Sequence, residues 1–155
     1  MEKRTSQVDH WSYSSLTLFL RNRLAFKKTY ILKQYDNTTS PSAVVGSAGH
    51  KALEAYYNGM SVDQAIEAGI THIERTSDAE IDYGKTGSRE KMLKDYTQAI
   101  NFYFAEMKPI HEVIGVEKAI IKEIKDRDNN VLTLPAKAKI DIVSRNEAGE
   151  IEVID

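Results

Sequence analysis

The sequence predicts an α+β fold in which a group of helices precedes an antiparallel β meander. Up to residue 108, apolar side chains recur at the i, i+3, i+4 spacing of a buried helix face. After Pro109 the segments become rich in Ile and Val, and the turn sequences DRDNN and NEAG separate them. We therefore expect one domain with a helical part, residues 1–110, and a sheet part, residues 111–155.

The first expected helix covers residues 12–31 and begins with serines that are good N-cap residues. Its apolar residues follow a roughly helical spacing, with an expected break near Asn22: Leu16, Phe19, Leu20, Leu24 and Ile31. The polar sequence KQYDNTTSPS, residues 33–42, is expected to be a loop. A short second helix is expected over residues 46–59, with Gly46 and Gly49 at its start.

Two further helices are expected over residues 61–77 and 88–108. Ser61 would cap the first of them, and three isoleucines recur on one face: Ile66, Ile70 and Ile73. The second has a longer apolar stripe: Leu93, Tyr96, Ile100, Tyr103 and Met107. Pro109 is expected to end this helix because proline cannot continue it.

The last hairpin can be predicted in register. NEAGE suits a three-residue loop over 147–149, with Gly149 in the left-handed conformation that follows a type I turn. This loop would place Val143 opposite Val153 and Asp141 opposite Asp155.

Two carboxylates directly opposed across strands repel each other unless a cation lies between them. Asp141 and Asp155 therefore suggest a site for a hard divalent cation with oxygen ligands. The alternative is that both aspartates are solvated residues at a sheet edge.

His50 lies four residues before Glu54, so both project from one face of the second helix. Gly46 and Gly49 are expected to let the start of that helix approach another backbone closely. An imidazole combined with carboxylates would accept Mn²⁺ well, and Mg²⁺ less readily because Mg²⁺ prefers oxygen. A purely structural histidine is the alternative.

Composition excludes several classes of protein. The chain has no cysteine, so disulfides, thiolate zinc sites and iron–sulfur clusters are excluded within it. It has no secretory signal and no apolar run long enough to span a membrane, so we expect a cytoplasmic protein. Residues 1–40 hold seven Lys/Arg against three Asp/Glu, which suits a polyanion. Scattered, solvated charge is the alternative.

Four stretches in this order resemble the PD-(D/E)XK nuclease superfamily, specifically its RecB-type exonuclease branch: SYSSLTLFLRNRLAFKKTYI, GSAGHKALEAYYNG, KAKIDIV and EVID. Gly46, His50, Leu53 and Glu54 match the helix motif of that branch in order. Ile140-Asp141 matches its first strand motif. Asp155 falls where the aspartate of Asp-x-Lys belongs. The resemblance covers nearly the whole chain.

The resemblance implies a restriction-endonuclease-like core and hydrolysis of DNA phosphodiester bonds. It implies that His50, Asp141 and Asp155 form the catalytic metal site for Mg²⁺ or Mn²⁺. Glu54 and Glu117 are secondary candidates near the metal ligands. Five residues are expected to contact DNA phosphates: Arg21, Arg23, Lys27, Lys28 and Lys33. The expected setting is DNA repair, recombination or phage DNA processing, with a helicase or recombination protein as a partner.

The sequence also departs from the family pattern. Ala138 stands where glycine is usual, and Asn22-Arg23 stands where many relatives carry Cys-Pro, so no iron–sulfur cluster is implied. The lysine of Asp-x-Lys would be residue 157, so we expect an incomplete core that is inactive alone. A non-catalytic nucleic-acid-binding or assembly module with the same fold is the main alternative. A helical scaffold without a site is a third.

Overall fold

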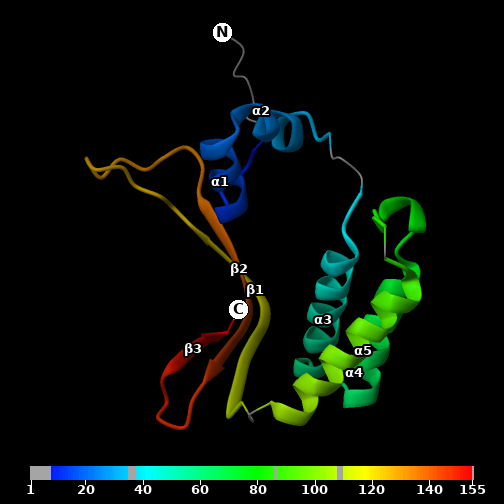
Figure 1. Cartoon of the computed structure of the whole chain (residues 1–155). Coiled ribbons are helices and arrows are strands. Elements are labelled where there is room, and N and C mark those ends of the chain that lie inside the picture. The colour runs from blue at the N-terminus through cyan, green and yellow to red at the C-terminus, as the bar shows by residue number, and fades with distance from the viewer. Residues whose placement is uncertain (1–7, 35–37, 86, 108–109, 155) are drawn as a thin grey trace. The chain divides into compact units, whose positions relative to one another are not determined.

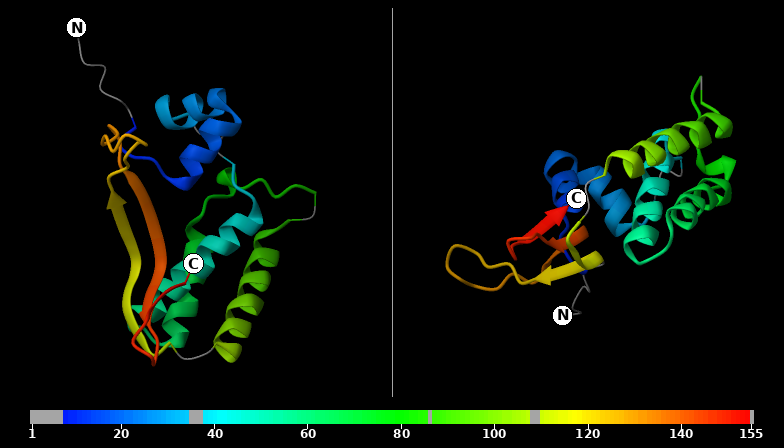
Figure 2. Two further views of the ribbon diagram at one scale, coloured as in Figure 1. Left: turned by 90° about the vertical axis from the view of Figure 1, so that its left-hand side faces the viewer. Right: turned by 90° about the horizontal axis from the view of Figure 1, so that it is seen from below.

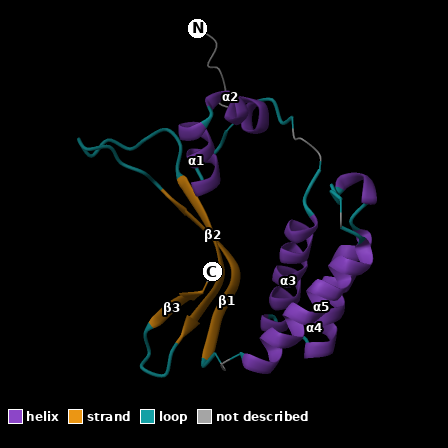
Figure 3. Cartoon of the chain, viewed as in Figure 1, coloured by secondary structure: helices purple, strands orange, loops and turns teal. Residues whose placement is uncertain are grey.

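The structure is a computed structural model of the chain that describes residues 8–34, 38–85, 87–107 and 110–154. Within this described part, five α-helices precede a three-stranded antiparallel sheet with the strand order β1-β2-β3 (Figure 1). Figure 3 shows the same division between helices and strands. The predicted α+β class, with helices before a β meander, is confirmed.

The chain divides into two compact units. The first unit contains the described residues of 1–36 together with 118–140, and the second unit contains those of 37–117 and 141–155. Strands β1 (Glu112–Lys122) and β2 (Ala136–Arg145) contribute residues to both units.

The N-terminal part of the first unit consists of short helices: α1 (Tyr13–Arg21), α2 (Arg23–Phe26) and a π-helix (Lys27–Ile31). Ser12 and Ser15 form a capping box at the start of α1, in which each side chain accepts a hydrogen bond from the other's backbone N–H. Asn22 ends α1, and its side chain caps α2 by accepting from the Ala25 N–H at 3.0 Å. The predicted break near Asn22 is confirmed.

An aromatic cluster holds the first unit together. Its rings have neighbouring centroids 5.1 to 5.8 Å apart: Trp11, Phe19, Phe26 and Tyr30. The Trp11 backbone pairs with the start of β2, since its N–H donates to the Pro135 carbonyl at 2.8 Å and its carbonyl accepts from Lys137 at 2.7 Å. Helices and strand of this unit are thereby joined by both ring packing and backbone hydrogen bonds.

Three helices of the second unit pack side by side and enclose its core: α3 (Pro41–Tyr57), α4 (Val62–Arg75) and α5 (Arg89–Glu106) (Figure 1). The buried core residues come from these helices and the loop before α5: Val44, Ala48, Ala52, Ile73, Ile81, Met92, Tyr96 and Ile100. Ala48 and Ala52 are fully buried. Their small side chains let the neighbouring helices approach the α3 backbone closely.

The start of α3 corrects the prediction. The helix begins at Pro41, so the predicted start at Gly46 is wrong, and the predicted loop over 33–42 extends two residues too far. The Ser40 side chain accepts a hydrogen bond from the Ala43 N–H at 3.3 Å, and proline suits the first helical position because it has no N–H to satisfy there. Gly46 and Gly49 lie inside the helix. A Cβ at either position would meet no atom within 4 Å, so the predicted close backbone approach is also wrong.

The two later helices largely follow the prediction. Ser61 caps α4 in a capping box with Gln64, and Ile73 is buried. In α5, Tyr96 and Ile100 of the predicted stripe are buried. The helix ends at Glu106, one residue before Met107, and Pro109 lies outside the described residues.

The β2–β3 hairpin has the predicted register. Strand β3 (Ile151–Ile154) forms a hairpin with β2 (Figure 2) and runs antiparallel to it. In this hairpin Val153 pairs with Val143. The loop closes where the Asn146 N–H donates to the Glu150 carbonyl at 3.0 Å. Gly149 has a φ of 84°, the left-handed conformation that its turn requires.

Candidate metal centre

Helix α3 carries His50 and Glu54 one turn apart. The His50 side chain is 59% exposed to solvent. The Glu54 carboxylate forms an ion pair with Lys51 of the same helix, with an N–O distance of 2.7 Å. Glu54 is therefore engaged along the helix surface and is not one of the converging side chains described next.

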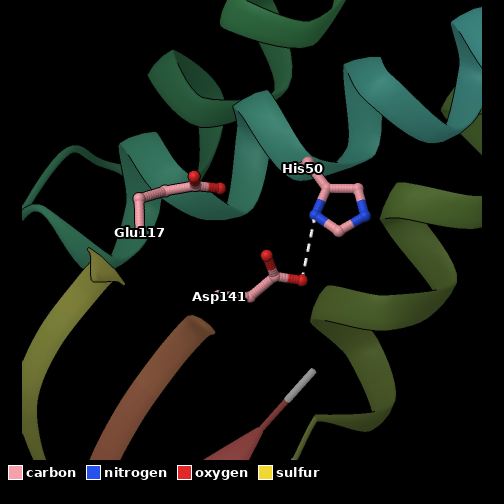
Figure 4. A group of neighbouring side chains, drawn as sticks. All are labelled: His50, Glu117 and Asp141. Atoms are coloured by element: carbon pink, nitrogen blue, oxygen red, sulfur yellow. Dashed lines mark ion pairs between the residues drawn. The ribbon is translucent and has the colours of Figure 1, made fainter. Parts of the chain in front are cut away.

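Three side chains from three different elements converge in the second unit: His50 of α3, Glu117 of β1 and Asp141 of β2 (Figure 4). Each offers one ligand atom, and these atoms lie within 4.8 Å of one another. His50 Nδ1 lies 3.2 Å from Asp141 Oδ2. We call these three residues the His–Glu–Asp cluster.

The His–Glu–Asp cluster has the donor set and the size for a divalent cation. Ligand atoms bound to one ion at about 2.1 Å are at most about 4.2 Å apart, so the observed spread needs only a small contraction. One imidazole nitrogen and two carboxylate oxygens suit Mn²⁺, and Mg²⁺ to a lesser degree. A divalent cation would also relieve the repulsion between the two carboxylates.

The backbone at Glu117 is unusual. Its φ is 54°, which lies in the left-handed region although the residue is part of strand β1. A non-glycine residue in that conformation stores about 1–3 kcal/mol of strain, and such residues concentrate at functional sites. The sequence predicts only a secondary role for Glu117, because β periodicity carries no signal for a residue that departs from strand geometry.

Asp155 lies outside the described residues. The last described pair of the hairpin is Ile142 with Ile154. The expected pairing of Asp141 with Asp155, and the metal role of Asp155, remain predictions.

The five basic residues expected to contact DNA all belong to the first unit. Arg21, Arg23, Lys27 and Lys33 are exposed, and Lys28 is half-buried. The Arg23 guanidinium lies 5.3 Å from the centroid of the Phe19 ring, a cation–π contact that limits where this charge can point.

A cavity of about 440 Å³ lies elsewhere in the second unit, between the first turns of α3 and α5. Val45, Tyr83 and Met92 are among its lining residues, and no member of the His–Glu–Asp cluster lines it. The cavity is therefore separate from the candidate metal centre and is no evidence for it.

The model of the PD-(D/E)XK nuclease superfamily matches residues 10–155. This chain belongs to that superfamily. Its members are typically metal-dependent nucleases that act on DNA, which agrees with a candidate metal centre made of acidic residues and a histidine. No curated protein and no solved structure matches the chain. Among the described residues of the chain, no helix is long and apolar enough to cross a bilayer.

Proposed function

We propose that this chain is a divalent-metal-dependent DNA nuclease of the RecB-type branch that hydrolyses phosphodiester bonds as an exonuclease. The observation that carries the proposal is the His–Glu–Asp cluster, found in a member of a nuclease superfamily. Residues 1–155 form the N-terminal part of a single nuclease domain in this proposal. Its setting is DNA repair, recombination or phage DNA processing, with a helicase or recombination protein as a partner.

His50, Asp141 and Asp155 hold Mg²⁺ or Mn²⁺ in the proposed site. Glu117 supplies a further carboxylate, since its ligand atom lies within 4.8 Å of those of His50 and Asp141. When bound, a divalent ion supplies positive charge against the scissile phosphate and lowers the pKa of water. The His50 side chain is 59% exposed, so a phosphate can approach it from solvent.

The basic residues of the first unit hold the DNA backbone. Such contacts depend on charge and carry no sequence information. The proposed nuclease is therefore expected to act on DNA without strong preference for base sequence.

A cleavage assay with Mn²⁺ tests this proposal. It uses the whole protein, in which the metal ligands are substituted one at a time. His50→Ala and Asp141→Asn should each lower the cleavage rate by about 100-fold or more, since even partners that only orient metal ligands are worth about 10- to 100-fold. His111→Ala and Asp63→Asn, which alter exposed residues outside the cluster, are the matched controls.

Equal cleavage by the wild type and either ligand variant would show that the site is assigned wrongly. The non-catalytic alternative predicts a different pattern. A nucleic-acid-binding module would bind DNA with a steep dependence on salt and would give no cleavage with any divalent metal.

A further inference from the structure

An exposed apolar face runs along α1 in the first unit. Tyr13, Leu16 and Leu20 are separated by three and four positions, so their side chains share one face of the helix. Their exposed fractions are 85%, 44% and 72%. Three large apolar side chains that lie on one helix face and are this exposed are typical of a surface that another molecule covers.

The opposite side of α1 is already packed. Ser15 is 2% exposed, and the Phe19 ring lies 5.8 Å from the Trp11 ring in the aromatic cluster. The helix is therefore fixed in place by its inner side, and its outer face stays largely exposed to solvent.

The helical segment that carries this face has charges of one sign. Residues 13–34 contain five Lys/Arg and no Asp/Glu. Arg21 and Arg23 directly follow the apolar face in the chain, and both are exposed. A molecule that covers the face must therefore offer both negative charge and apolar surface.

We propose that this face binds single-stranded DNA, with unpaired bases packed on Tyr13, Leu16 and Leu20 and the backbone phosphates held by the neighbouring cations. A single strand offers a regular line of negative charge and the flat apolar faces of its bases. In a duplex those base faces are stacked on one another, and phosphates and sugars cover the outside. The inference deepens the proposed function, on which it rests, by naming single-stranded DNA as the substrate class.

Fluorescence anisotropy tests the surface without cleavage. The whole chain, in EDTA, is titrated into a labelled oligothymidylate of about 20 nucleotides, longer than a typical single-strand site, and into a duplex of equal length. Wild type should bind the single strand more tightly. Tyr13→Ala should weaken that binding by about fivefold or more, as expected for the loss of one stacked base. Tyr13→Phe keeps the ring and should bind like wild type.

Phe102→Ala is the matched control, because Phe102 is 71% exposed on α5 in the second unit. It should leave DNA affinity unchanged. Leu20→Ser gives a second variant at an exposed position and should also weaken single-strand binding. Unchanged thermal midpoints of the variants show that they are folded.

The proposal is overturned if Tyr13→Ala and Leu20→Ser bind the single strand as wild type does, or if duplex and single strand bind equally. It is also overturned if these variants change only the oligomeric state, since the face would then join copies of the chain. Failure of the proposed function has another signature. In that case DNA is not cleaved with any metal, while the Tyr13 dependence of single-strand binding persists.

Discussion

Glu117 shows how a single residue can be placed for chemistry at a cost in stability. Its carboxylate joins His50 and Asp141, while its backbone has a φ of 54°. A side chain in the left-handed region is strained, whereas glycine is not. At a strand position with a negative φ, a residue with a side chain is instead more stable than glycine, because glycine loses more conformational freedom on folding.

The strain at Glu117 predicts an inverted order of stability. Glu117→Gly should be more stable than Glu117→Ala, by about 1 kcal/mol in the free energy of unfolding. Denaturant unfolding measures the difference. The same pair of substitutions at neighbouring Lys118, where φ is not positive, should show the alanine variant as the more stable one. The usual order at both positions would mean that Glu117 is not strained.

At the scale of elements, α4 and α5 meet where a glycine faces a tyrosine. The Tyr96 hydroxyl donates a hydrogen bond to the Ile66 carbonyl at 2.9 Å. A Cβ on Gly69 would lie 2.1 Å from that hydroxyl oxygen, so the ring occupies the space that a side chain would need. Burial raises the pKa of Tyr96 to about 12, so the hydroxyl stays protonated and able to donate.

Gly69→Ala should therefore destabilise the fold by about 1–3 kcal/mol, the usual cost of overpacking a core. The matched control is Gly46→Ala in α3, where a Cβ meets no atom within 4 Å. That substitution should stabilise by about 0.5–1 kcal/mol, since alanine favours helix interiors. Thermal unfolding compares the two variants, and similar effects at both positions would contradict the packing described.

Asp78, in the short 3₁₀-helix Asp78–Glu80, links the end of α4 to the start of α5. It accepts hydrogen bonds from Tyr83 and from Arg89, and Arg89 also donates to the Thr76 carbonyl at 2.7 Å. The Tyr83 hydroxyl, followed by Arg89, lowers the pKa of Asp78 below its usual 3.8.

A lowered folded pKa gives stability that is present above the unfolded pKa of 3.8 and is lost as the pH falls through the folded value. Asp78→Asn should therefore be less stable than wild type at neutral pH, and the difference should shrink in acid. Unfolding midpoints across this pH range measure it. Asp128→Asn, at an exposed carboxylate in the first unit, is the control. A difference that does not change with pH would contradict the assignment.

Elements set by local chemistry could be predicted from the sequence. The β2–β3 register follows from the turn at Gly149, and the break at Asn22 follows from its capping side chain. The predicted start of α3 is too late because Ser40-Pro41 ends a polar stretch that is typical of a loop, although serine before proline is also a helix start. The sequence predicts Glu117 only as a secondary candidate, because a glutamate does not itself mark the left-handed backbone at that position.

At the scale of the whole molecule, positive charge is concentrated in the first unit and the candidate metal centre belongs to the second.

If the first unit holds DNA, Lys27→Gln and Lys33→Gln should weaken binding to all sequences alike. Each should reduce the slope of log affinity against log salt by about 1, the contribution of one phosphate contact. Lys85→Gln in the second unit is the control. Anisotropy titrations at several salt concentrations measure the slopes, and unchanged slopes would remove these residues from the interface.

Pulsed electron paramagnetic resonance of bound Mn²⁺ tests the metal centre most directly, because it detects an imidazole nitrogen coordinated to the ion. Wild type should show this nitrogen coupling, and His50→Ala should lose it together with most of the Mn²⁺ affinity. His111→Ala should keep both. A nitrogen coupling that survives in His50→Ala, or an affinity that neither His50→Ala nor Asp141→Asn lowers, would contradict a metal centre at the His–Glu–Asp cluster.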